Sequence, residues 1–265
     1  MKFFPVLVFC ALICLTSPAG AGEILKTGIS SVNASTENPL VDVSVYISDA
    51  QAAAAERNWT KTLFLTTRGL AWYPGDAELH CLQGYSYRKM GQYGKSVDLV
   101  SEGILMDPKP VRYANRGYGY LALGNFSAAL ADAEAGIALN ASYPTNYAVK
   151  ALALQGMGRN AEALAAADAA LALEPESAHY WHVKGTLLSA GGNCTGSREA
   201  LERSLAIDPD YDLPYPGFTG ALGNLAALNA TCNPATASPL PTKSPSGGIA
   251  AIGFLIAAVV LKIRR

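Results

Sequence analysis

Residues 110–143, PVRYANRGYGYLALGNFSAALADAEAGIALNASY, contain one copy of a pattern that recurs about every 34 residues and decides the fold. Prolines set the period, since Pro74 and Pro108 are 34 positions apart and so are Pro175 and Pro209. Glycines recur in the same phase, at Gly91, Gly124, Gly158 and Gly192. A fixed period of about 20 to 50 residues is the signature of a repeat array, so each copy is expected to form one structural unit.

Four copies share a large residue at position 4, a small one at 8, an aromatic or Leu at 11, Gly at 15, and small residues at 20 and 27, and a fifth, looser copy keeps part of the pattern. The matches are His80, Gly84, Tyr87, Gly91, Tyr93, Ser96, Gly103 and Pro108 in 77–109; Tyr113, Gly117, Tyr120, Gly124, Phe126, Ala129, Gly136 and Leu139 in 110–143; Tyr147, Ala151, Leu154, Gly158, Ala163, Ala167, Ala170 and Pro175 in 144–177; Trp181, Gly185, Leu188, Gly192, Ser197, Leu201, Ser204 and Pro209 in 178–211; and Tyr46, Ala50, Ala53, Gly69 and Pro74 in a looser copy at 43–76. This pattern resembles the tetratricopeptide repeat (TPR). The resemblance covers about two thirds of the chain and implies an all-α solenoid of about five helical hairpins, with a capping helix at 212–232.

The spacing has a physical reason. Positions 4, 8 and 11 share one face of a first helix, and positions 20, 24 and 27 lie on the facing side of a second, so small residues at 8 and 20 allow close approach. Glycine at position 15 is expected to end the first helix in a left-handed turn, and proline at position 32 to stop the second.

The two ends of the chain carry signals for export and membrane attachment. Residues 1–21 have Lys2, an apolar run and small residues up to Ala21, as in a secretory signal peptide. A lead-in at 22–42 precedes the repeats, a Pro/Ser/Thr stalk follows at 233–246, and 247–265 is an apolar run with a basic end. We therefore predict a single transmembrane helix in 247–265, with the N-terminus on the exterior face of the cell membrane and the C-terminus cytoplasmic.

Charge argues against nucleic acid as a partner, and asparagine usage agrees with an exterior location. The chain has 20 Lys and Arg against 21 Asp and Glu, so nothing in its composition indicates the basic face that nucleic-acid binding requires. N-glycosylation acceptor patterns occur at Asn33, Asn58, Asn125, Asn140, Asn193 and Asn229.

Two cysteines are placed for a disulfide bond. In the frame of the repeat, Cys194 lies in the turn after a first helix, and Cys232 follows the capping helix in the next layer. A bond between them would clip the last helix to the array in an oxidising compartment; the alternative is two free thiols. Cys81 is then left over as a small apolar core residue.

The resemblance also implies a concave groove lined by the first helices. Its candidate partner-binding residues are Tyr85, Arg88, Lys89, Arg112, Asn115, Tyr118, His179 and His182. Tyr anchors and basic residues suit an extended protein segment with some negative charge, or an envelope glycan; the alternative is that Tyr85 and Tyr118 pack between repeats. No third ligand accompanies His179 and His182, so no metal site is expected, and neither is a cofactor or a catalytic residue.

The sequence thus predicts a membrane-anchored TPR scaffold that binds a protein or an envelope polymer without turnover. A non-catalytic accessory subunit of an envelope enzyme or transport complex, and a structural component of the surface layer, are the alternatives.

Overall fold

The computed structural model describes residues 41–232, in which every regular element is a helix. The predicted signal peptide, nearly all of the lead-in, the stalk and the apolar run at 247–265 lie outside the described residues. Within 41–232, no helix combines the length and apolar character needed to cross a membrane.

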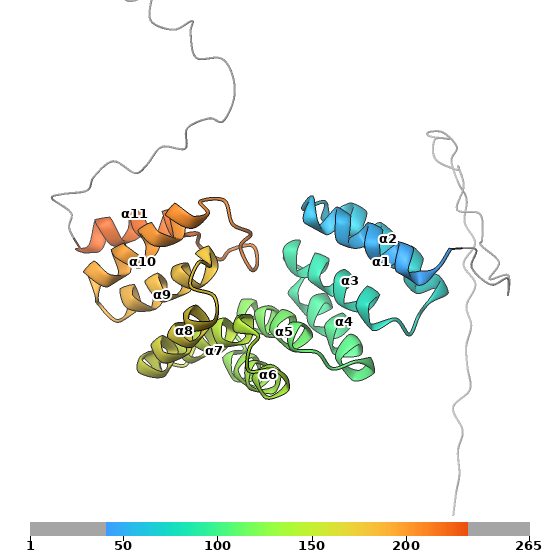
Figure 1. Cartoon of the computed structure of the whole chain (residues 1–265), viewed down its shortest axis with the longest axis horizontal. Helices are drawn as coiled ribbons and strands as arrows, with labels where there is room; N and C mark the ends of the chain where they lie inside the picture. The colour runs from blue at the N-terminus through green and yellow to red at the C-terminus, as the bar shows by residue number, and fades with distance from the viewer. Residues whose placement is uncertain (1–40, 233–265) are drawn as a thin grey trace, which may run out of the picture. The chain divides into compact units, whose positions relative to one another are not determined.

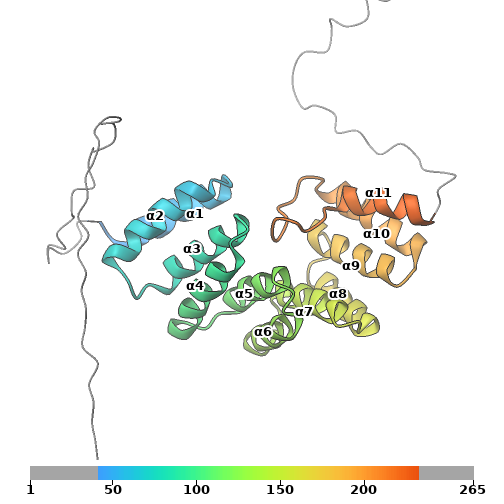
Figure 2. The same ribbon diagram turned by 180° about the vertical axis from the view of Figure 1, so that it is seen from behind.

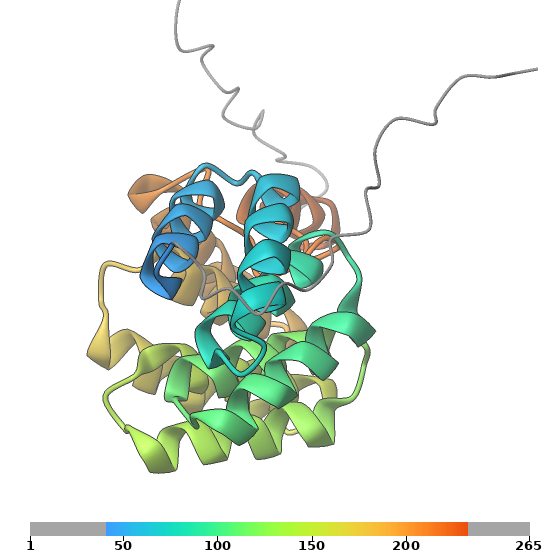
Figure 3. The same ribbon diagram turned by 90° about the vertical axis from the view of Figure 1, so that its right-hand side faces the viewer.

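Ten of the helices form five successive hairpins, followed by one further helix (Figure 1). The hairpins are α1 (Val43–Ala55) with α2 (Trp59–Trp72), α3 (Ala77–Lys89) with α4 (Tyr93–Met106), α5 (Pro110–Ala122) with α6 (Phe126–Leu139), α7 (Pro144–Gly156) with α8 (Asn160–Leu173), and α9 (Ala178–Ala190) with α10 (Cys194–Ile207); α11 (Ala221–Cys232) comes last. Each hairpin packs against the next. Figure 3 looks along the array from the α1 and α2 end. The all-helical hairpin array expected from the repeat is therefore confirmed.

Local sequence explains where the helices begin and end. The side chains of Asp42, Asn58 and Asp76 accept hydrogen bonds from backbone N–H groups of the helices that follow them. The expected left-handed turns also occur: the glycines at position 15 have φ between 73° and 77°, at Gly91, Gly124, Gly158 and Gly192.

Small residues at position 8 bring the helices into close contact. A Cβ atom on Gly84 would lie 2.6 Å from Val100 Cγ2, and one on Gly117 would lie 2.7 Å from Val149 Cγ1. The largest core cluster spans α5 to α9 and is rich in buried alanines, which keep these helices close along their length.

Two glycines of α4 give a matched test of this packing. A Cβ on Gly103 would lie 2.5 Å from Cys81 Sγ and 3.0 Å from the Ala77 carbonyl oxygen, whereas a Cβ on Gly94 would meet nothing within 4 Å. We expect Gly94→Ala to raise the free energy of unfolding by up to about 1 kcal/mol. Gly103→Ala is expected to lower it by about 1 to 2 kcal/mol, because overpacking outweighs the gain in helix propensity. Urea unfolding followed by circular dichroism checks both, and stabilisation by Gly103→Ala would contradict the packing described.

The last helix is held by a disulfide bond. Cys194, the first residue of α10, is bonded to Cys232, the last residue of α11, with their Cα atoms 6.0 Å apart. This is the predicted pairing. Cys81 is a free, buried thiol whose pKa burial raises to about 11.

The connection before α11 differs from expectation. The capping helix was predicted to cover residues 212–232, but α11 starts at Ala221. Pro214 and Pro216 cannot donate helical hydrogen bonds, and Gly217 has a φ of 88°. Residues 208–220 therefore form a long loop.

Candidate functional site

The loop at 208–220 lies on the concave side of the array, across the helices that were expected to form an open groove. In Figures 1 and 2 it leaves the end of α10 and projects towards α3 before turning back to α11. Its contacts with α3, described below, join residues more than 120 positions apart, and its contacts with α9 join residues 29 to 39 positions apart. We call residues 208–220 the docked loop.

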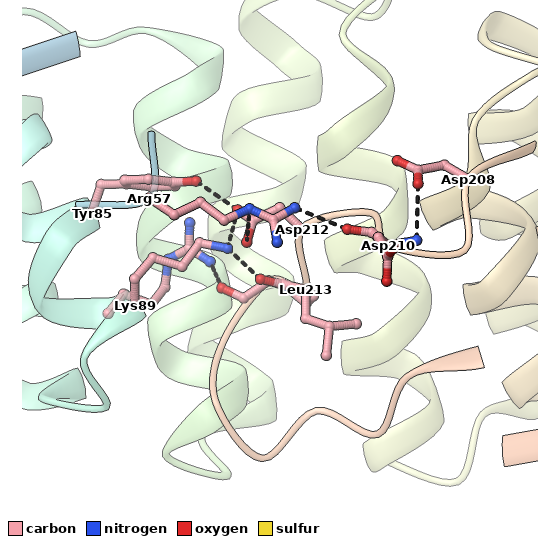
Figure 4. A network of polar contacts seen from close by, with 9 residues as sticks. Arg57, Tyr85, Lys89, Asp208, Asp210, Asp212 and Leu213 are labelled. Carbon is pink, nitrogen blue, oxygen red and sulfur yellow. Dashed lines mark hydrogen bonds and ion pairs between the residues drawn. The ribbon is translucent and has the colours of Figure 1, made fainter. Parts of the chain in front are cut away.

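Polar side chains from the first two hairpins hold the middle of the docked loop (Figure 4). Asp212 accepts a hydrogen bond from the Tyr85 hydroxyl, at 3.1 Å, and forms an ion pair with Lys89. Lys89 also donates to the carbonyl oxygen of Leu213. Arg57 donates to the carbonyl oxygen of Asp210 at 2.9 Å. The carboxylate of Asp212 thus lies among cationic and hydroxyl donors.

Arg88 of α3 holds the next part of the docked loop, at Pro214. Its side chain is only 2% exposed. It donates one hydrogen bond to the carbonyl oxygen of Pro214 and another, at 3.1 Å, to the side-chain oxygen of Asn115. The guanidinium also lies 4.9 Å from the ring centre of Tyr85 and 5.2 Å from that of Tyr118. Burial lowers the pKa of Arg88.

Aromatic rings of the docked loop cover the two histidines of α9. The His182 ring contacts those of Tyr211 and Phe218, with centres 5.8 and 5.3 Å away, and its Nδ1 is hydrogen-bonded to the Tyr211 hydroxyl. The His179 ring also contacts Tyr211 and Phe218, and its Nε2 lies 2.6 Å from the Tyr118 hydroxyl. Each of the two imidazoles is therefore hydrogen-bonded to a neighbouring tyrosine hydroxyl.

Burial under the loop perturbs the titration of this cluster. It lowers the pKa of His179 to about 3 and that of His182 to about 4, because an imidazolium would lose its hydration. It also lowers the pKa of Lys89 to about 8, although the hydrogen bond to Asp212 opposes the shift. Within residues 41–232, no cluster of His, Cys, Asp and Glu could hold a metal ion.

One residue of the site adopts an unusual backbone conformation. Arg57 has a φ of 56°, in the left-handed region, at the position where the other four repeats carry glycine. A side chain in that region costs about 1 kcal/mol relative to glycine. The strained residue is thus one of two arginines, with Arg88, that donate hydrogen bonds to carbonyl oxygens of the docked loop.

The structure corrects the expected arrangement of the groove. Tyr85, Arg88, Lys89, Tyr118, His179 and His182 do gather on the concave side, but the docked loop contacts five of them, all but Tyr118, where an open groove was expected. Tyr85 also lines the open pocket described below, and the role of these residues in binding a partner stays a prediction. Tyr118 is buried in the core cluster, which agrees with the alternative of packing between repeats.

Arg112 has a different place from the one expected. Its buried guanidinium forms ion pairs with Glu78, at 3.0 Å, and with Asp107, at 2.5 Å. These contacts join α3 and the α4–α5 turn to α5, so its hydrogen-bonding capacity serves the repeat interface. Asn115 contributes indirectly, by accepting a hydrogen bond from Arg88.

The concave side keeps an open section next to the docked loop. A pocket of about 220 Å³ lies between α1, α3 and α5. It is lined by Gln51, Ala54, Glu78, Cys81, Leu82, Tyr85, Val111, Arg112 and Asn115. A second pocket, of about 230 Å³, lies against the loop and shares Tyr85 and Asn115 with the first. The two pockets therefore adjoin.

The predicted glycosylation sites fall in three kinds of place. Asn58, Asn125 and Asn193 cap the second helices of their hairpins by accepting from backbone N–H groups. Asn140 is exposed after α6. Asn229 is buried and accepts from Arg198 at 2.5 Å, so a glycan there would require this contact to break. Asn33 lies outside the described residues, and glycosylation at all of these sites stays a prediction.

No protein-family model matches the chain, and neither does any curated protein sequence. Solved structures do match. TTC0263, a thermophilic TPR protein of Thermus thermophilus, is similar with a TM-score of 0.59 and 18% identity, over 64% of this chain and 93% of that one. MamA (41-end) from Desulfovibrio magneticus RS-1 is similar with a TM-score of 0.51 and 17% identity, over 64% and 97%. The fold is TPR-like. At this identity the likeness concerns the fold alone, and the function rests on the site.

Proposed function

We propose that this chain is an exported, membrane-tethered TPR scaffold that binds a protein partner by holding an extended segment on its concave side. The observation that carries the proposal is the docked loop itself. Side chains of the concave side hold a non-helical stretch of main chain through hydrogen bonds to the carbonyl oxygens of Asp210, Leu213 and Pro214. A surface that binds the main chain of a non-helical segment of its own chain has the donors needed to bind such a segment from another protein.

The open pocket supplies the entry for such a segment. It combines the exposed apolar side chain of Val111 with the polar groups of Glu78 and Asn115. Because it adjoins the pocket beside the docked loop, an extended segment seated on Val111 would reach Tyr85. The proposed partner is therefore a protein with an exposed, extended segment; an envelope glycan stacking on Tyr85 is the alternative.

Export and tethering are proposed from the sequence. The signal-peptide pattern of 1–21, the acceptor asparagines and the apolar run at 247–265 support an exterior, single-pass arrangement. The Cys194–Cys232 bond is consistent with it, because disulfides persist in oxidising compartments. The mechanism is binding by shape, hydrogen bonding and charge, without turnover.

Site-specific photocrosslinking in the full chain on intact cells tests this proposal. A photoreactive residue replaces Val111, in the open pocket, or Leu105, whose side chain on α4 is 86% exposed and lies outside that pocket. We expect one defined protein to be captured from position 111 and not from position 105, as identified by mass spectrometry. The same capture from both positions, or none from position 111, would overturn the assignment of the concave side.

A further inference from the structure

We propose that the docked loop is an internal ligand of the groove, which an extended partner segment carrying a carboxylate in a Tyr- and Pro-rich stretch displaces. This inference rests on the proposed function and names the chemistry of its partner.

The loop is bound through groups that any peptide possesses. Four of its carbonyl oxygens accept hydrogen bonds from side chains. Arg57 donates to Asp210 and Lys89 to Leu213. Arg88 donates to Pro214 and Tyr93 to Pro216. These donors come from side chains of the first two hairpins, whereas the acceptors are main-chain atoms. Another extended segment could therefore take over the same bonds.

Charge and ring contacts specify which segment fits. The carboxylate of Asp212 is bound by Lys89 and by the Tyr85 hydroxyl, so an acidic residue is favoured at this point. The Tyr215 ring contacts that of Tyr93, with centres 6.1 Å apart, in an edge-on arrangement. The loop sequence from Asp210 to Pro216, DYDLPYP, thus describes the chemistry that the groove accepts.

The contacts of the buried Arg88 allow a partner segment to replace the docked loop. Among the described residues, its two hydrogen-bond acceptors are neutral: the Pro214 carbonyl and the Asn115 amide. A buried guanidinium is better compensated by a carboxylate than by neutral oxygens. A partner segment that brings a second acidic residue to Arg88 would therefore compete favourably with the loop.

The loop can leave without dismantling the array. Its ends are fixed by α10 and by α11, which the Cys194–Cys232 bond attaches to α10. Each hairpin packs directly on the next, and from the loop the rings of Tyr215 and Phe218 pack against the core cluster of α5 to α9. An attached segment competes at an effective concentration in the millimolar range. A free peptide of micromolar affinity is then expected to bind at least about tenfold more weakly while the loop is docked.

The test measures binding of a fluorescein-labelled peptide with the sequence of residues 208–219, DPDYDLPYPGFT, by anisotropy. Three full-length proteins are compared: wild type, an opened variant with 210–216 replaced by seven Gly and Ser residues, and the double variant Arg57→Gly, Asp212→Ala. Arg57→Gly restores the residue that the other repeats carry, so the double variant is expected to fold even if the opened one does not. Circular dichroism verifies the helix content of each.

We expect the peptide to bind the opened variant at least tenfold more tightly than wild type, and the double variant at least threefold more tightly. A control peptide with Asp212→Ala is expected to bind the opened variant about tenfold more weakly. Absence of binding to folded variants, or equal affinity for all three proteins, would overturn the inference. Capture from position 111 in the photocrosslinking experiment, together with that negative result, would leave the proposed function standing and remove only the internal-ligand claim.

Discussion

Lowering the pH from 7.5 to 5.0 is expected to reduce the free energy of unfolding by about 4 kcal/mol, through the two histidines under the docked loop. Burial lowers the folded-state pKa of His179 to about 3 and that of His182 to about 4. An unfolded histidine titrates near 6.5, so below that pH the unfolded state binds more protons than the folded state. The stability present above pH 6.5 is therefore lost as the pH falls towards the folded-state pKa values. At pH 5.0 each histidine accounts for a loss of about 2 kcal/mol in the free energy of unfolding.

Urea unfolding at the two pH values, followed by circular dichroism, measures this effect. The matched control is the variant His179→Gln, His182→Gln, in which the dependence between pH 5.0 and 7.5 is expected to be mostly lost. Since both rings contact Tyr211 and Phe218, acidification is also expected to release the docked loop before the hairpins unfold. A wild-type stability that does not change with pH over this range would show that the histidines are not buried as described.

Removing the disulfide bond is expected to lower the free energy of unfolding by about 3 to 4 kcal/mol, because the bond closes a long loop. Cys194 and Cys232 are 38 residues apart, and the bond attaches α11 to α10 while enclosing the docked loop. The comparison is between wild type and the variant Cys194→Ser, Cys232→Ser, each with and without reductant. Reductant should destabilise wild type only, because the variant keeps no disulfide bond among the described residues. The cysteine that remains there, Cys81, is an unpaired thiol. Equal unfolding midpoints in all four samples would mean that the bond does not constrain the chain.

The repeat frame was predictable because local chemistry fixes it. Gly91 and its counterparts require left-handed turns, and the period of the prolines sets the length of each hairpin. Together these place the helix starts at Val43, Ala77 and Pro110. The disulfide followed from the same frame, because a residue's position in the repeat determines the edge of the array on which it lies.

The docked loop was not predictable in the same way. The contact between Arg88 and Pro214 joins residues 126 positions apart and depends on the curvature of the whole array, which no local pattern encodes. Two signals were nevertheless present in the sequence. The stretch around Pro214 and Pro216 is too rich in proline for a helix, yet too rich in aromatic residues for a solvated connection. Arg57 in place of the repeat's glycine was the second.

Zero-length crosslinking with a carbodiimide tests most directly whether the loop occupies the groove. The reagent activates carboxylates and joins them as amides to amines in contact, and the lowered pKa of Lys89, about 8, favours the reactive amine. We predict a Lys89–Asp212 amide in the full chain, found by mass spectrometry and lost in Asp212→Asn. The exposed pair Lys150–Glu134, 3.0 Å apart, is the internal control. Coupling of Lys150 to Glu134 without any coupling of Lys89 to Asp212 would contradict the docked loop.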